Sequence, residues 1–137
     1  MALRWSISHD DRLIVAHITE AFVLADIPVF YAAIIAEGGL SYRKLVDLTL
    51  VPIDIAVLDL GGISKAVRAA MNDPQLGPVA FIVPNDAVHD MVEIFDRKTA
   101  IDRPLGIFRN GVSAMRWLDE IAPVAVEERP VPKLQEV

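Results

Sequence analysis

PVAFIV at residues 78–83 is a short, wholly apolar segment. Such a segment is typical of a strand covered on both faces, as the strands of a parallel sheet are. The residues after it follow the helical spacing i, i+3, i+4 and i+7, with apolar side chains at Val88, Met91, Val92 and Phe95. A second short apolar segment, residues 105–108, comes after this predicted helix. This order predicts two parallel strands joined by a covering helix in a right-handed crossover.

The rest of the chain extends this alternation of strands and helices. Residues 3–8 and 13–18 flank a polar turn and predict an antiparallel hairpin, and residues 42–50 predict a central strand. Helices are predicted from about Asp26 to the Gly38-Gly39 C-cap, from about Asp54 to Met71 with a kink or split at Gly61-Gly62, over residues 86–98, and from Asn110 or Ser113 to Ala122. The expected fold is α/β, with a mixed, mostly parallel sheet, an N-terminal β-hairpin and about four helices.

The composition predicts one domain that folds without metal, disulfide or cofactor. The chain has 137 residues, 53% of them hydrophobic and 23% charged, which suits a single sizeable core. It has no cysteine, so disulfides, thiolate metal sites and cysteine nucleophiles are excluded. We expect the domain to span residues 1–122. Residues 123–137 are rich in proline and glutamate without periodicity, and we expect an extended or disordered tail there.

The charge and hydropathy patterns exclude several classes of partner. A net charge of -6 disfavours nucleic acid, because such binding draws on clustered Lys and Arg, and Arg43-Lys44 is the nearest approach to a cluster. The N-terminus lacks a signal peptide core. The longest apolar stretch, residues 21–36, is broken by Asp26 and Pro28, so we expect no stable membrane insertion. These observations predict a cytoplasmic protein.

Catalytic motifs are not recognisable in the sequence. It has no phosphate-cradling loop and no nucleophile elbow, and the histidines His9, His17 and His89 are not spaced as a local metal-binding pair. Adjacent helical residues point about 100° apart, so we expect His89 to face Glu93, one turn on, and not Asp90. We expect no enzymatic activity; the alternative is an enzyme that uses Asp47, Asp54 or His89.

Asp47 and Thr49 form one candidate binding site. They lie near the carboxyl end of the predicted central strand, where open α/β sheets bind ligands, and Asp54 follows at the start of the next helix. The alternative is structural: Asp47 and Thr49 hydrogen-bond the following loop and hold the second helix in place.

The first predicted helix carries no charge from Ile27 to Ala36, so every side of it is apolar. A helix that covers a sheet normally shows water a polar side, so this surface points to a subunit interface, an apolar ligand pocket or a membrane-facing patch. The alternative is that the exposed face carries only small alanines, which cost little free energy in water. The candidate contact residues are Ile27, Phe30, Tyr31 and Ile34. We expect a homodimer or another protein partner at this surface; the alternative is a carrier of a small apolar ligand or lipid in a cleft between the first two helices.

Residues 3–121 resemble the SpoIIAA-like branch of the STAS superfamily. The resemblance rests on the apolar strand at residues 78–83, on the sequence PLGIFR at residues 104–109 followed by AMRWL at residues 114–118, and on Asp47-Leu48-Thr49 at the central strand. It implies a β-α sandwich and a non-enzymatic regulatory or scaffolding role. Sporulation antagonists of this family are phosphorylated on a serine shortly after an aspartate. Here Ile55 and Ala56 follow the matching Asp54, so no such phosphorylation is expected.

Overall fold

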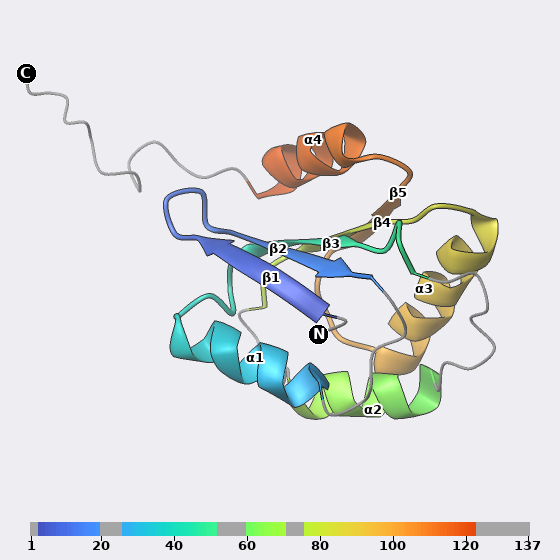
Figure 1. The fold of residues 1–137 in the computed structure, drawn as a ribbon, viewed down its shortest axis with the longest axis horizontal. Helices are drawn as coiled ribbons and strands as arrows, with labels where there is room; N and C mark the ends of the chain where they lie inside the picture. Colours follow the sequence, from blue (N-terminus) through green and yellow to red (C-terminus); the bar gives the residue numbers. More distant parts are fainter. Residues whose placement is uncertain (1–2, 20–25, 52–59, 71–75, 123–137) are drawn as a thin grey trace, which may run out of the picture.

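The computed structural model describes residues 3–19, 26–51, 60–70 and 76–122. Its centre is a five-stranded sheet with the order β1-β2-β3-β4-β5 (Figure 1). The strands are β1 (Leu3–Ser8), β2 (Leu13–Ile18), β3 (Arg43–Asp47), β4 (Val79–Ile82) and β5 (Leu105–Phe108). β1 and β2 pair antiparallel, and the pairs β2-β3, β3-β4 and β4-β5 are parallel. The predicted mixed, mostly parallel sheet with an N-terminal hairpin is confirmed.

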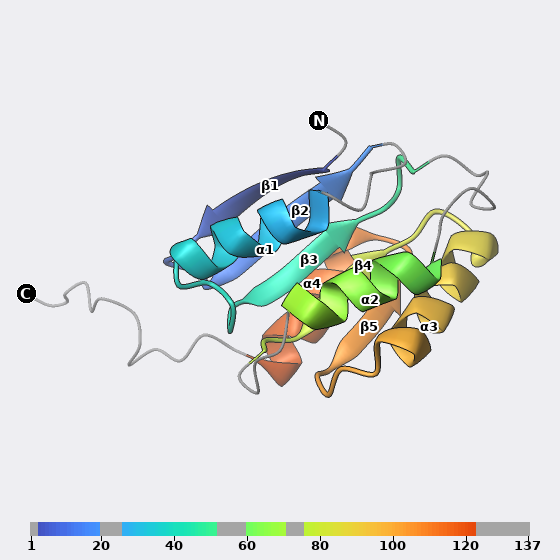
Figure 2. The same cartoon turned by 90° about the horizontal axis from the view of Figure 1, so that it is seen from below.

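In the described residues, four helices cover the two faces of this sheet unequally. α1 (Asp26–Ala36), α2 (Leu60–Ala70) and α3 (Asp86–Thr99) lie side by side on one face, where α1 contacts α2 and α2 contacts α3 (Figure 2). α4 (Gly111–Ile121) lies on the opposite face and contacts β3, β4 and β5. Within residues 3–19, 26–51, 60–70 and 76–122, no helix combines the length and the apolar character needed to cross a bilayer.

The alternation of side chains along the strands divides the interior into two cores. On one face, Leu45, Ala80 and Ile82 pack with Ala114 and Leu118 of α4. The main core, on the other face, lies between the sheet and the three helices, and its fully buried members include Ile14 and Ile34. Because successive strand residues point to opposite faces, β4 is apolar on both sides, whereas β3 places Arg43 on one face and Lys44 on the other.

The helix ends follow from local chemistry that the sequence predicts. Gly38 takes the left-handed conformation with φ 72°, and the Gly39 N–H donates to the Ile34 carbonyl oxygen at 2.9 Å, which closes α1 in a Schellman arrangement. The Asn85 and Asn110 side chains accept hydrogen bonds from backbone N–H groups of the first turns of α3 and α4, each at 2.9 Å. Asn110, and not Ser113, therefore caps the last helix.

One predicted boundary needs correction. The central strand was expected to reach Leu50 but ends at Asp47, because the Asp47 side chain accepts the Thr49 N–H and turns the chain out of the sheet. Gly61-Gly62 lies at the start of the described part of α2, which is continuous from Leu60 to Ala70. The segment on the other side of the predicted kink or split lies outside the described residues. The predicted helix start at residues 54–59 and the predicted tail at residues 123–137 lie outside the described residues.

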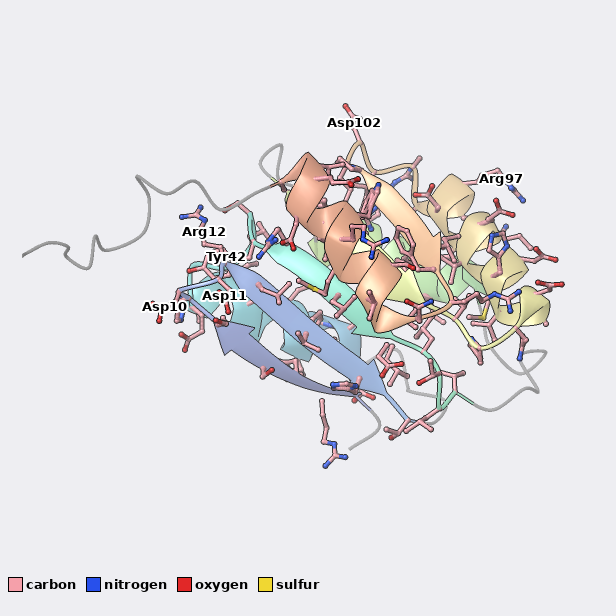
Figure 3. The ribbon with its side chains drawn as sticks, turned by 90° about the horizontal axis from the view of Figure 1, so that it is seen from above. Asp10, Asp11, Arg12, Tyr42, Arg97 and Asp102 are labelled. Atoms are coloured by element: carbon pink, nitrogen blue, oxygen red, sulfur yellow. The ribbon has the colours of Figure 1, made fainter. Side chains whose placement is uncertain are left out.

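The turn of the hairpin is attached to the start of β3. Asp10, Asp11, Arg12 and Tyr42 are grouped at one end of the sheet (Figure 3). The Arg12 guanidinium lies 5.4 Å from the centre of the Tyr42 ring, and the Tyr42 hydroxyl lies 2.7 Å from His9 Nδ1. His9 is therefore a turn residue, as the sequence indicates, with Tyr42 as its partner.

Candidate ligand-binding site

An apolar cavity lies between the sheet and the three helices α1, α2 and α3. Its volume is about 120 Å³. An engineered apolar cavity of about 150 Å³ holds benzene, so this space suits a ligand fragment of a few carbon atoms. The apolar residues that line it are Leu3, Ala16, Ile18, Ile27, Phe30, Val46, Leu48, Ile63, Val67, Val79, Phe81, Met91, Val92 and Phe95.

Three polar side chains, Tyr31, Lys44 and Arg103, complete the cavity lining. Lys44 is only 3% exposed, because it points from β3 to the inner face. Its Nζ donates to the carbonyl oxygens of Leu40 at 2.7 Å and of Tyr42 at 3.0 Å. Arg103 follows α3 and precedes β5, and its side chain is 2% exposed. Two cationic side chains are therefore buried at one cavity, near the amino-terminal ends of the strands.

The two cations and the phenol perturb one another at this end of the cavity. Burial lowers the pKa of Lys44 to about 8, and the nearby positive charge of Arg103 adds to this effect. Burial raises the pKa of Tyr31 to about 12, while Arg103 acts in the opposite direction. Burial also lowers the pKa of Arg103, opposed by Tyr31 and Asp96. An arginine nonetheless stays charged in a protein. At neutral pH the cavity is therefore flanked by two positive charges and a neutral hydroxyl.

The residues predicted from the uncharged first helix divide between the cavity and the core. Ile27, Phe30 and Tyr31 line the cavity. Ile34 is fully buried in the main core and is not among the lining residues. Asp54 lies outside the described residues. The first helix thus forms one wall of the cavity with residues of its uncharged segment, which the sequence indicated as a contact surface.

Asp47 and Thr49 do not line this cavity. Asp47 Oδ1 accepts from the Thr49 backbone N–H at 2.9 Å and from Thr49 Oγ1 at 2.6 Å, and Oδ2 lies 3.2 Å from His17 Nδ1. Partial burial would raise the pKa of Asp47, but the hydrogen bonds from Thr49 and the interaction with His17 prevail and lower it. The contacts of Asp47 with Thr49 match the structural alternative, in which these side chains hold the loop after the strand.

Sequence reasoning missed Lys44 and Arg103. A signal for Lys44 was present, since it occupies an inward position of a strand predicted to be covered on both faces, two residues before Val46. For Arg103 the sequence offered no signal, because its burial depends on how the loop before β5 meets α1 and α3. In the sequence, Arg43-Lys44 is only the nearest approach to a basic cluster, and in the structure the two side chains point to opposite faces of the sheet.

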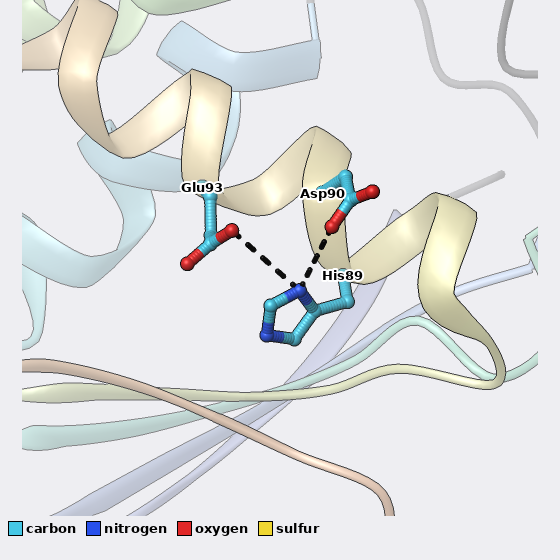
Figure 4. Close-up of side chains that lie close together, drawn as sticks. All are labelled: His89, Asp90 and Glu93. Atoms are coloured by element: carbon cyan, nitrogen blue, oxygen red, sulfur yellow. Dashed lines mark hydrogen bonds and ion pairs between the residues drawn. The ribbon is translucent and has the colours of Figure 1, made fainter.

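His89, Asp90 and Glu93 form a polar group on α3 (Figure 4). His89 Nδ1 lies 3.2 Å from Asp90 Oδ1 and 3.7 Å from Glu93 Oε1. The expectation that His89 faces Glu93 and not Asp90 was wrong in its second part, because the short Asp90 side chain bends back to the ring of its neighbour. Both carboxylates are exposed, as is usual for a solvated helix surface.

No protein-family model, curated protein or solved structure matches this chain. The resemblance to the SpoIIAA-like family therefore stays a prediction.

Proposed function

We propose that this chain is a non-enzymatic binding module that takes a small apolar ligand into the cavity between the sheet and α1, α2 and α3. The observation that carries the proposal is a cavity of about 120 Å³ whose walls are mostly aliphatic and aromatic. Natural interiors are close-packed and contain few voids larger than a water molecule, so a space of this size next to a second, filled core calls for an occupant. Asp47 and Thr49, the candidate binding residues near the carboxyl end of β3, do not line this site.

Binding of 1-hexanol, measured by isothermal titration calorimetry, tests this proposal. Burying about six carbon atoms at roughly 0.8 kcal/mol each corresponds to a Kd of about 0.1 to 1 mM. Val46→Phe fills the cavity from β3 and should abolish binding. Val15→Phe is the matched control, because Val15 packs on the α4 side of the neighbouring strand β2 and the variant should still bind. If the unmodified protein gives no binding heat up to the solubility limit of hexanol, the proposal fails.

Self-association through α1 is a second candidate, favoured by one observation. Val29 is 54% exposed and Ile35 is 52% exposed, on a helix without charge from Ile27 to Ala36. Burial of this surface in a symmetric dimer would remove the exposed apolar area from water. Analytical ultracentrifugation at micromolar concentration should then show a dimer that dissociates in the Val29→Lys, Ile35→Lys double variant. A monomer at that concentration contradicts this candidate.

A further inference from the structure

Arg103 is a buried cation whose hydrogen-bonding capacity is largely unused. Its Nη1 lies 4.0 Å from Asp96 Oδ1, which is beyond hydrogen-bond range. Among the described residues, no acceptor receives a hydrogen bond from its Nε or Nη1. Buried charged donors that lack acceptors are costly, and an acceptor that enters the cavity would recover this free energy. The guanidinium therefore marks a place where a ligand oxygen would be stabilised.

Arg43, on the other face of the sheet, is a buried arginine with a structural role, and its hydrogen bonds can be compared with those of Arg103. Its Nη1 donates to Asp119 Oδ1 at 2.6 Å, and its Nη2 donates to the Asp11 carbonyl oxygen at 2.8 Å. Only its Nε lacks a partner. A carboxylate thus neutralises the charge of Arg43, whereas Asp96 lies too far from Arg103 to accept a hydrogen bond.

The charges around the cavity specify the charge of the missing partner. Lys44 donates to two neutral carbonyl oxygens, so its positive charge has no anionic partner among these contacts. Arg103 adds a second positive charge, and Asp96 offsets one of the two from 4.0 Å. Counted over the described residues alone, the balance is one uncompensated positive charge, which a ligand with one negative charge neutralises and a phosphate dianion would exceed. The planar donor fork of arginine fits the two oxygens of a carboxylate.

We propose that the ligand of the cavity is a small amphipathic carboxylic acid, whose carboxylate binds Arg103 beside Lys44 and whose hydrocarbon chain lies among the apolar residues of the cavity. This inference rests on the function proposed above. It adds the class of head group, which the apolar lining alone does not specify. Tyr31 lines the same cavity.

The test compares hexanoate with 1-hexanol at pH 7 by isothermal titration calorimetry of the unmodified protein. The two probes have equal chain length, so their difference reports the head group. Hexanoate should bind about tenfold more tightly or better, as expected for charge-assisted hydrogen bonds in a buried site. If hexanol binds as tightly as hexanoate, the head-group proposal is overturned while the proposed function stands. If neither probe binds, both proposals fail.

Variants then assign the preference to Arg103. Arg103→Met should lose the preference for hexanoate over hexanol, and Arg103→Lys should retain part of it. Arg109→Met is the matched control, because Arg109 is 52% exposed and lies outside the cavity lining, and it should behave as the unmodified protein. Retention of the full preference in Arg103→Met would contradict the assignment. The comparison of the two probes on the unmodified protein stays decisive even if a variant folds poorly.

Discussion

The two faces of the sheet each bury cationic side chains, but they treat them differently. The α4 face pairs Arg43 with Asp119 and fills the space around it, with Ala80, Ala114 and Leu118 fully buried. The face under α1, α2 and α3 buries Lys44 and Arg103 beside a cavity, and no carboxylate in the described part of the chain is in hydrogen-bond range of either. A filled and neutralised face stabilises the fold. On the other face, a bound ligand would fill the cavity and neutralise the excess positive charge.

The contrast arises from two adjacent residues. Arg43 and Lys44 are neighbours in β3, and the alternation of a strand sends their side chains to opposite faces. The same local sequence therefore supplies a structural ion pair on one side and part of a candidate binding site on the other. Which role a buried charge has depends on the partner it meets across the interior, and not on its own position in the chain.

The largest expected contrast is between removal of Asp119 and removal of Arg103. Asp119→Ala leaves the buried Arg43 without its carboxylate, so the free energy of unfolding should fall by about 2 kcal/mol. Arg103→Met removes a poorly paired buried charge, so the free energy of unfolding should rise by about 1 kcal/mol. Urea denaturation measures both.

Glu120→Ala is the control for Asp119→Ala, because Glu120 is an exposed acid on the same helix and its removal should change stability by less than about 0.5 kcal/mol. A loss of stability in Arg103→Met comparable to that in Asp119→Ala would contradict the distinction between the two faces.

A pH titration sharpens the same comparison. In the unfolded chain Lys44 keeps its proton up to about pH 10.5, but in the folded protein it loses the proton near pH 8, because burial and Arg103 lower its pKa. Between these values the unfolded state binds more protons, so stability rises with pH. Tyr31, whose pKa is raised to about 12, stays neutral in the folded protein up to pH 10.

The free energy of unfolding should therefore rise by about 2 kcal/mol between pH 8 and pH 10 in the unmodified protein, relative to Lys44→Met. Chemical denaturation at three pH values in this window measures the difference. Equal pH dependence of the two proteins would show that Lys44 keeps its proton in the folded state.

The sequence predicts those parts of the structure that depend on near neighbours. The apolar segments predict the strands at residues 79–82 and 105–108, and the caps Asn110 and Gly38 set helix ends through contacts within a few residues. The end of β3 was missed because the hydrogen bonds of Asp47 to Thr49 compete with the sheet, and residue type alone does not decide that competition.

The apolar residues of the candidate site were predicted from the composition of the first helix. Its buried cations were missed, because their burial results from tertiary packing. An uncharged helix is visible in the sequence, so Ile27, Phe30 and Tyr31 were selected, and all three line the cavity. The burial of Lys44 and Arg103 depends on helices and loops packed over them. Asp47 was predicted because ligands commonly bind at the carboxyl ends of parallel strands. The buried cations Lys44 and Arg103 lie instead near the amino-terminal ends of the strands.

The smallest expected effects come from adding carbon atoms to each face. Ala80→Val enlarges a fully buried side chain on the α4 face, so overpacking should cost about 1 to 2 kcal/mol despite the better strand propensity of valine. Val46→Ile adds one methylene toward the cavity from the neighbouring strand, so it should raise stability by about 0.5 to 1 kcal/mol.

Thermal unfolding of the two variants measures whether their changes in stability have opposite signs. Both substitutions enlarge an apolar side chain within a strand, so the sign depends on the free space around that side chain. Hexanoate gives the comparison a second readout: it should stabilise the unmodified protein more than Val46→Ile, since the added methylene occupies space that the ligand chain needs. Destabilisation by both substitutions would mean that the two faces are packed alike, and it would contradict the proposal that the cavity holds a ligand.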